Sequence, residues 1–334
     1  MKWLKRIFLG FCSLFALLVA IGLSTQALLT KIDASKFAPP GQLVDIGGFK
    51  LHLHCTGQGS PTVVLEAGLG SIATSWALVQ REVAKTTRVC SYDRAGYGFS
   101  DSGPLPRTSQ QIAKELHMLL TNAGEKGPFV LAGHSFGGLN VRMFDHAYPS
   151  EVAGLLLIDS AVEEALGSKL WMPLYNHLES DSMLLLGRIM GRLGLARLFF
   201  PDTLLKSTPF LPEEKAVIKA FSVSTKCGFA FLDESHTLPQ SFLQAKNECR
   251  TIGDKPLVVI VAGKNPDLEA IAGSKENAET MKQEWTRFQK NLAKLSTRST
   301  YLIAENSAHM IPFEQPEIIV MAIDQMVGDI RANR

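Results

Sequence analysis

The sequence predicts an α/β fold with a doubly wound sheet. Strand-like and helix-like segments alternate over residues 42–161 and again over residues 251–334, as such a sheet requires. An apolar stretch that ends in Gly-His-Ser-Phe-Gly-Gly, at 133–138, continues directly into a helical pattern. Between residues 162 and 250 the strand pattern stops, and short apolar helical segments replace it. We therefore expect one α/β core, formed by 42–161 and 251–334, with a helical insertion at 162–250.

The strands are predicted from alternating or continuous apolar runs that are bounded by turn residues. Two runs of alternating apolar and polar residues, joined by Gly47-Gly48, indicate a β-hairpin. His52 and His54 share one face of its second strand. With no third ligand nearby, we expect that face to be exposed rather than to bind metal. Helical patterns end near residue 85, cover about 108–122, and begin at about 139 and 316. The predicted strands are 42–46, 49–55, 62–66, 87–93, 128–134, 153–158, 255–263 and 299–304.

The segment around Ser135 has the sequence form of a nucleophile elbow, a strained turn between a strand and a helix. Such a turn lifts the serine hydroxyl above the sheet. It also brings backbone segments so close that only glycine fits at positions 133 and 137. A glycine-rich turn with an incidental serine is the alternative. The preceding strand and following helix, with a later Asp and His in the chain, favour Ser135 as the nucleophile.

A basic flank and an apolar run open the chain. Basic residues at positions 2, 5 and 6 precede the 17 residues from Ile7 to Leu23, which have no polar face. This length is at the short end for a transmembrane helix and slightly long for the core of a signal peptide. Because Thr25-Gln26-Ala27 is a mediocre cleavage site, we predict that residues 1–30 form an uncleaved signal anchor. A cleaved signal peptide is the alternative.

The anchor also predicts where the rest of the chain lies. A basic flank stays in the cytoplasm, so the following domain is expected outside it, anchored to the inner membrane. If the segment is cleaved, the domain is secreted or periplasmic. Residues 31–41, which include Pro39-Pro40-Gly41, are predicted to be a linker between anchor and sheet.

Composition excludes several classes of function. Thirty-four basic and 32 acidic residues give a formal net charge of +2, so nucleic acid is not an expected partner. The eight histidines form no His-Glu-x-x-His motif and the five cysteines form no Cys-x-x-Cys motif. We expect no metal site and no cofactor. The glycine loop at 68–70 also lacks the spacing of nucleotide-binding loops.

Two motifs together resemble the α/β-hydrolase superfamily, specifically its esterase and lipase-like branch. Asp-Arg-x-Gly-x-Gly-x-Ser at 93–100 is followed by Gly-His-Ser-x-Gly-Gly at 133–138, and the resemblance covers roughly 42–328. It implies an eight-stranded, mostly parallel sheet with helices on both faces. It also implies a helical lid inserted after the sixth strand, which matches the break at 162–250.

The resemblance implies the rest of a catalytic site. His309 follows the last strand, where the family keeps its general base. A glycine loop follows the strand 62–66, and we expect the N–H groups of Leu69 and Phe136 to form the oxyanion hole. A surface histidine is the alternative for position 309.

Two residues compete for the role of triad acid. Asp267 lies after strand seven, near the commonest family position, but the spacing from Gly263 is one residue too long. Asp159 directly ends strand six, as in pancreatic-type lipases and several haloalkane dehalogenases, which resemble the chain there. We favour Asp159, because an unpaired carboxylate at this sheet edge would be costly, and keep Asp267 as the alternative acid. A helix cap is the other interpretation of Asp159.

An exported domain can contain disulfides, because they persist in oxidising compartments. Cys55 and Cys90 fall on strands that are neighbours in the family's sheet, so we predict that they pair. We also predict a Cys227–Cys249 disulfide in the lid, with Cys12 free in the membrane run. Four reduced, buried thiols are the alternative.

The predicted function is hydrolysis of carboxylic esters through an acyl-enzyme on Ser135. The expected substrate is a small molecule with a small to medium apolar acyl or alcohol group, which Met, Leu and Phe residues on the underside of the lid would favour. Packing of these residues in an ordinary core is the alternative. Amide, peptide or lactone hydrolysis and haloperoxidase-like perhydrolysis use the same triad and stay open. A non-catalytic, ligand-binding member of the fold is the alternative from another class. Dehalogenases and epoxide hydrolases place Asp where this chain has Ser135.

Overall fold

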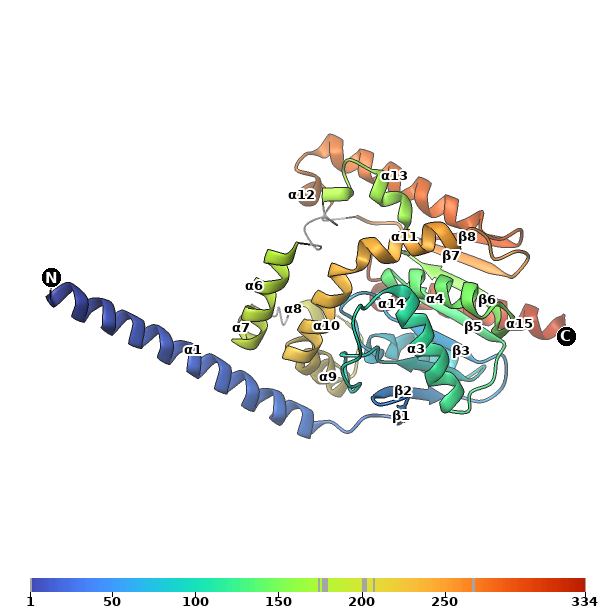
Figure 1. Ribbon diagram of the computed structural model, residues 1–334. Coiled ribbons are helices and arrows are strands. Elements are labelled where there is room, and N and C mark those ends of the chain that lie inside the picture. Colours follow the sequence, from blue (N-terminus) through green and yellow to red (C-terminus); the bar gives the residue numbers. More distant parts are fainter. Residues whose placement is uncertain are drawn as a thin grey trace.

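The computed structural model describes residues 2–173, 175, 180–199, 203–206, 208–265 and 268–333. An eight-stranded sheet forms its centre, with the strand order β1-β2-β4-β3-β5-β6-β7-β8 (Figure 1). β1 and β2 are antiparallel to their neighbours and the other pairs are parallel, which confirms the predicted sheet. The strands are β1 Gln42–Asp45, β2 Lys50–Thr56, β3 Val63–Glu66, β4 Val89–Tyr92, β5 Phe129–His134, β6 Val152–Ile158, β7 Leu257–Ala262 and β8 Ser299–Ala304.

Helices cover both faces of the sheet because its central strands are apolar on both sides. The helices α2 (Ala77–Val83) and α15 (Pro316–Ala332) bury one apolar cluster against one face. The helices α3 (Ser109–Asn122), α4 (Phe136–Ala147) and α13 (Lys275–Ala293) bury a second cluster against the other face. Short helices α12 (Leu268–Ala272) and α14 (Ile311–Glu314) follow β7 and β8.

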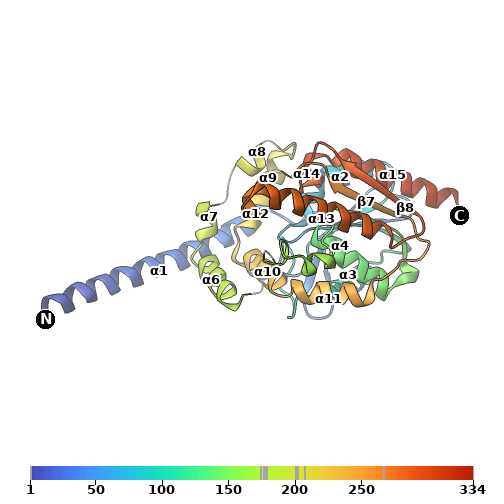
Figure 2. The ribbon, with the colours of Figure 1, turned by 90° about the horizontal axis from the view of Figure 1, so that it is seen from above.

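The insertion between β6 and β7 is helical, as predicted. The first of its longer helices, α6, lies beside α10 at the end of the molecule nearest the N-terminal helix (Figures 1 and 2). Leu205, Phe210 and Phe221 pack in a third apolar cluster that joins the insertion to the core. The helices of the insertion are α6 Asp181–Arg192, α7 Leu195–Phe199, α8 Thr203–Lys206, α9 Pro212–Ser222, α10 Thr225–His236 and α11 Leu238–Glu248.

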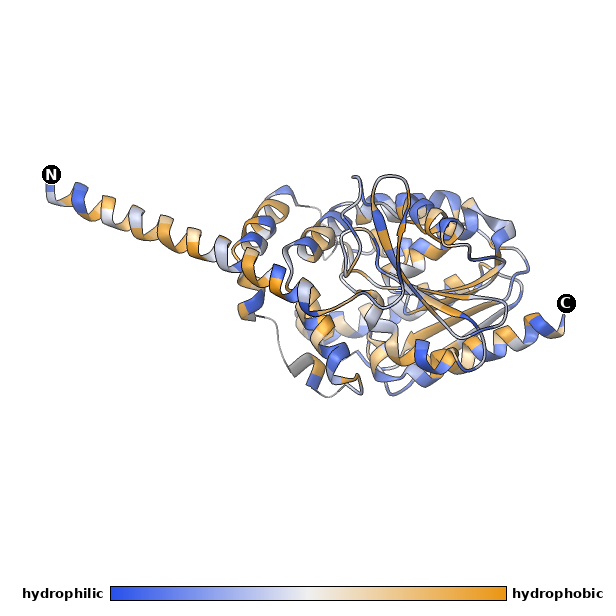
Figure 3. Ribbon diagram, turned by 90° about the horizontal axis from the view of Figure 1, so that it is seen from below, coloured by the Kyte–Doolittle hydropathy of each residue, from blue (hydrophilic) through white to orange (hydrophobic). Residues whose placement is uncertain are grey.

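The N-terminal helix α1 runs from Lys2 to Lys36. It is long and apolar enough to cross a membrane, with a mean hydropathy of 2.5 over an 18-residue window of which none is buried. Figure 3 shows its apolar part extending away from the domain. The helix corrects the predicted linker at 31–41. Residues up to Lys36 stay helical, because this end of α1 packs against the insertion, and the extended connection begins only at residue 37.

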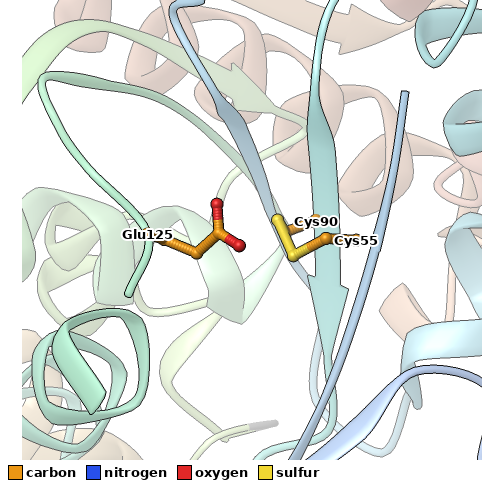
Figure 4. Close-up of side chains that lie close together, drawn as sticks. All are labelled: Cys55, Cys90 and Glu125. Atoms are coloured by element: carbon orange, nitrogen blue, oxygen red, sulfur yellow. A yellow bond between two sulfur atoms is a disulfide. The ribbon is translucent and has the colours of Figure 1, made fainter. Parts of the chain in front are cut away.

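The first predicted disulfide is present. Cys55 and Cys90 lie directly opposite each other on β2 and β4, with their Cα atoms 4.0 Å apart and their sulfurs bonded (Figure 4). The carboxylate of Glu125 lies beside the two sulfurs, and it forms an ion pair with Arg88 at 2.6 Å. These three side chains are the one group of potential metal ligands among the described residues, but sulfurs joined in a disulfide are not thiolate ligands.

The second predicted disulfide, Cys227–Cys249, is wrong: both cysteines are free and buried. Cys227 lies in the first turn of α10, in the cluster that joins the insertion to the core. Cys249 caps the far end of α11 and contacts the sulfur of Met143 at 3.4 Å. The two thiols are held in different apolar clusters, so the even count of cysteines does not reflect a second pair.

Candidate active site

Ser135 lies between β5 and α4 in a backbone conformation that few residues other than glycine adopt, with φ 54° and ψ −121°. Three backbone hydrogen bonds hold this turn, including one of 3.0 Å from the Ser135 N–H to the carbonyl of Ile158. A Cβ on Gly133 would lie 2.4 Å from the carbonyl oxygen of Gly137, and one on Gly137 would lie 2.4 Å from the carbonyl oxygen of Glu66. Glycine is therefore required at both positions by close backbone approach, as the sequence predicts.

Three side chains from three loops meet above the carboxyl edge of the sheet. The Ser135 hydroxyl donates to His309 Nε2 at 3.0 Å, and His309 Nδ1–H donates to Asp159 Oδ2 at 2.6 Å. Asp159 directly follows β6, and His309 lies in the loop between β8 and α14. The chain therefore brings together the three residues that the sequence singled out, in the order of a hydrogen-bonded nucleophile, base and acid.

Asp159 is enclosed by donors. It is 3% exposed, and its second oxygen, Oδ1, accepts hydrogen bonds from the indole N–H of Trp285 at 2.9 Å and from the N–H of Ala262 at 3.3 Å. Its backbone φ is 40°, and among the described residues Ser135 and Asp159 are the two non-glycine residues with a positive φ. The competing acid, Asp267, lies outside the described residues.

The electrostatics of this group favour a charged Asp159 beside a readily protonated His309. Burial alone would raise the pKa of Asp159, but hydrogen bonds from His309, Trp285 and Ala262 hold that pKa below its usual value. Removal of the His309 ring from water lowers its pKa, but the hydrogen bond and negative charge of Asp159 outweigh this effect. The pKa of His309 is therefore raised above the ordinary value.

His134, the residue before Ser135, has a role that the sequence analysis did not assign. It is buried, and its Nε2–H donates to the backbone carbonyl of His309 at 2.8 Å. Burial and the neighbouring His309 ring lower the pKa of His134 to about 3, so this imidazole is neutral. It fixes the loop that carries His309. A histidine inside a Gly-His-Ser-x-Gly motif was the available signal, but the partner lies 175 residues away in the chain.

The three side chains face a pocket of about 330 Å³. Leu69 and Phe136, the two predicted oxyanion donors, both line it, and Gly70 next to Leu69 has a φ of +76°. Among the described residues, nothing accepts a hydrogen bond from the Leu69 N–H. The wall is mainly apolar, with Lys264 and Asn265 at one side. Its other members are Ala161, Trp171, Tyr175, Leu238, Leu268, Ile271, Trp285 and Ala308.

A buried arginine supports the loop that carries Leu69. The Arg94 guanidinium donates to the carbonyls of Ala67 at 2.6 Å and Gly68 at 2.9 Å. The same group forms ion pairs with Glu66, at the end of β3, and with Glu234, on α10. Arg94 belongs to the Asp-Arg motif of the sequence, which the structure thus connects to the predicted oxyanion loop and to the lid.

A larger pocket of about 610 Å³ lies elsewhere, between β2, α2, α9 and the connection after α1. Here the prediction of an exposed histidine face is wrong, because His52 is buried. Its Nδ1 bonds to Asp93 at 2.8 Å and its Nε2 faces the carbonyl of Pro40. Burial lowers the pKa of His52, but Asp93 and Pro40 raise it overall. With both ring nitrogens engaged, this cluster offers no second acid–base site.

Comparison with known proteins agrees with the fold and motifs. The chain matches the model of the alpha/beta hydrolase family over residues 51–322, and it belongs to that family. It is 23% identical over 339 residues to an uncharacterized Bacillus subtilis protein, YbdG, covering 99% of this chain and 98% of that one. It is 27% identical to a Hormonema carpetanum protein named as a probable transporter, efuK, over 87% of this chain, and spans 43% of that protein's length.

Solved structures share the fold at low sequence identity. The enol-lactonase from Burkholderia xenovorans superimposes with a TM-score of 0.61 and 19% identity, over 86% of this chain and 100% of the other. This likeness supports the fold, and the family match supports a hydrolase.

Proposed function

We propose that this protein is a serine hydrolase that cleaves carboxylic esters through an acyl-enzyme. The observation that carries this proposal is the continuous set of hydrogen bonds from Ser135 to His309 to Asp159 at a strained elbow. In the first step Ser135 Oγ attacks the acyl carbon while His309 takes its proton, and His309 then protonates the departing alcohol. A water molecule, deprotonated by His309, releases the acid and restores Ser135.

The surroundings of the three residues support this chemistry. Leu69 and Phe136 line the pocket next to Ser135, and their N–H groups would bind the negative oxygen of the tetrahedral intermediate. The apolar wall suits an apolar acyl or alcohol group of small to medium size, because the pocket holds about 330 Å³. The three hydrogen-bond donors outweigh the effect of burial and keep Asp159 ionised, so it stabilises the imidazolium that forms during each proton transfer.

We further propose that α1 anchors the domain in a membrane, with the hydrolase outside the cytoplasm. The apolar part of α1 has no buried residue in its most hydrophobic window, and basic residues precede it. The Cys55–Cys90 disulfide supports an oxidising location, since such bonds are rare in the cytosol.

Labelling with a fluorophosphonate and turnover of p-nitrophenyl butyrate test the catalytic proposal. The full-length protein should label once and hydrolyse the ester, and Ser135→Ala should lose both properties while its thermal unfolding is unchanged. Ser102→Ala, at an exposed serine remote from the pocket, is the matched control and should behave as wild type. Near-normal turnover by Ser135→Ala would remove the mechanism, and absence of labelling in folded wild type would favour a ligand-binding protein.

A further inference from the structure

The lid carries an apolar surface that nothing in the described structure covers. Met183, Leu185, Leu186, Ile189 and Met190 on α6, with Leu198 on α7, form this surface, which we call the outer face of α6–α7. Their exposed fractions run from 38% for Met190 to 74% for Leu198. Soluble domains rarely expose such a contiguous group of large apolar side chains, so the surface indicates an interaction site.

The inner side of α6 shows that this exposure is built into the helix. Gly187 and Gly191 face α10, where added Cβ atoms would lie 2.8 Å from Leu232 and 3.6 Å from Phe229. Arg188 also faces α10, 4.8 Å above the ring of Phe229. A helix on a water-soluble surface normally directs its apolar side inward, and α6 does the reverse.

The anchor helix is fixed to the same part of the lid by buried polar contacts. Gln26 is 3% exposed, in a helix that is otherwise largely solvent-accessible. Its side-chain amide donates to the carbonyl of Val223 at 3.0 Å and to the hydroxyl of Thr225 at 3.1 Å. Arg197, on α7, donates to Gln26 Oε1 at 2.6 Å and forms an ion pair with Asp33 at 2.8 Å. We call these five residues the anchor clasp.

The clasp places the lid at the level where α1 would leave a membrane. The helix has 35 residues, or about 52 Å at 1.5 Å per residue, whereas a hydrocarbon core of about 30 Å needs about 20 residues. The apolar run of 17 residues from Ile7 to Leu23, most of whose large side chains are exposed, comes close to that length. A Cβ on Gly22, at the end of this stretch, would lie 3.2 Å from the carbonyl of Leu193, between α6 and α7. Figure 2 shows α6 and α7 beside the inner end of α1.

We propose that the outer face of α6–α7 lies in the lipid headgroup boundary of the bilayer that α1 spans. The partner is a lipid surface because this face adjoins the apolar part of α1. A bilayer that α1 spans would therefore also contact the outer face of α6–α7. The inference goes beyond the catalytic proposal and rests on the proposed anchoring by α1. The anchor then does more than tether the hydrolase, since it sets the orientation of the lid on the membrane.

Quenching of a single fluorophore by lipid nitroxides tests this contact in the full-length protein. Cys12→Ser removes the exposed thiol, and the remaining cysteines are buried or paired. In that background, nitrobenzoxadiazole is attached at Leu185→Cys, on the outer face, or at Leu14→Cys, in the apolar part of α1. Met321→Cys, on α15, is the matched control, since Met321 is 55% exposed and Leu185 is 62% exposed. Each protein is reconstituted in phosphatidylcholine vesicles with and without nitroxide-labelled lipid.

The label at position 185 should be quenched several-fold more strongly than the label at 321, and its emission should shift to shorter wavelength. Quenching at 14 with none at 185 beyond the control would overturn the inference and leave the anchor intact. Absence of quenching at both 14 and 185 would mean that the anchoring proposal itself fails. A label at 185 that is shielded from aqueous iodide, yet not quenched by lipid, would show a protein partner and also overturn the inference.

Discussion

Asp159 and the groups that touch it set the chemistry of the candidate site. Its carboxylate receives one charge-assisted hydrogen bond from His309 and two further hydrogen bonds, so one face binds the base and the other is held by the scaffold. A carboxylate fixed in this way keeps the imidazole in one tautomer and one orientation. Two substitutions next to His309 are expected to move its pKa in opposite directions.

Asp159→Asn should lower both turnover and the pKa of His309. The base must be neutral to accept a proton, so kcat/KM falls as pH drops through a pKa that lies above the ordinary 6.5. Loss of the negative charge lowers that pKa and moves the acid limb of the kcat/KM pH profile to lower pH. Turnover should also fall by about 10⁴-fold, because the wrong tautomer is favoured. Asp267→Asn is the control in the same pH profiles, and a shift in that variant alone would make Asp267 the acid.

Trp285→Phe should shift the acid limb to higher pH. Without the indole N–H, the carboxylate of Asp159 carries more charge toward His309 and raises its pKa. Turnover should fall by about tenfold, as expected for loss of one hydrogen bond to a charged group. Trp171→Phe is the matched control, since its ring packs 5.0 Å from that of Trp285 but its indole N–H lacks a hydrogen-bond partner in the described structure. Equal pH profiles for both variants would argue that Trp285 only fills space.

At the scale of elements, four loops at one edge of the sheet supply the site, and buried polar bonds join them. His134 holds the loop after β8, and Arg94 holds the loop after β3 while it also pairs with Glu234 on α10. The Arg94 guanidinium therefore binds both the lid and the predicted oxyanion loop. Such buried pairs are costly to break, because each leaves an uncompensated charge.

Arg94→Lys should reduce both stability and turnover. An ammonium keeps the charge but cannot bond in a fork to two carboxylates and two carbonyls together. We expect the free energy of unfolding in urea to fall by about 2–4 kcal/mol, and kcat to fall because the Leu69 loop loosens. Arg81→Lys is the matched control: it also pairs with a lid glutamate, but at an exposed site where the cost should stay below about 1 kcal/mol. Equal losses in the two variants would contradict the coupling.

At the scale of the whole molecule, α1 is at once an apolar projection and part of the folded domain. Its first part is exposed along its length, whereas Gln26 and Asp33 belong to the anchor clasp. Removal of the two parts should therefore have different consequences.

Deletion of residues 2–20 should release the protein from membranes and keep its thermal stability, because the clasp is retained. Deletion of residues 2–36 should also release it but lower the free energy of unfolding by about 2 kcal/mol, since Arg197 loses its acceptors on Gln26, Thr30 and Asp33. Fractionation and thermal unfolding of the two proteins provide the measurement. Identical unfolding temperatures would show that the clasp contributes nothing to the fold, and membrane retention of both would locate the anchor elsewhere.

Features that depend on neighbours in the chain were determined by the sequence alone. Alternating segments define the sheet, glycines at 133 and 137 define the turn at Ser135, and the run from Ile7 to Leu23 defines the apolar helix. Each is a local rule of periodicity or close approach, which needs no knowledge of distant residues.

Pairings between distant residues were decided only by the tertiary structure. The sequence favoured Asp159 but kept Asp267 as an alternative. The structure places Asp159 within 2.6 Å of His309, because the carboxyl ends of β6 and β8 lie at the same edge of the sheet with only β7 between them. Counting cysteines suggested Cys227–Cys249, whereas packing holds those thiols in separate clusters. Gln26 gave no signal, since a glutamine near the end of an apolar helix acquires its partners only when α7 and α10 fold beside it. Such contacts depend on the path of the whole chain, which local sequence patterns do not encode.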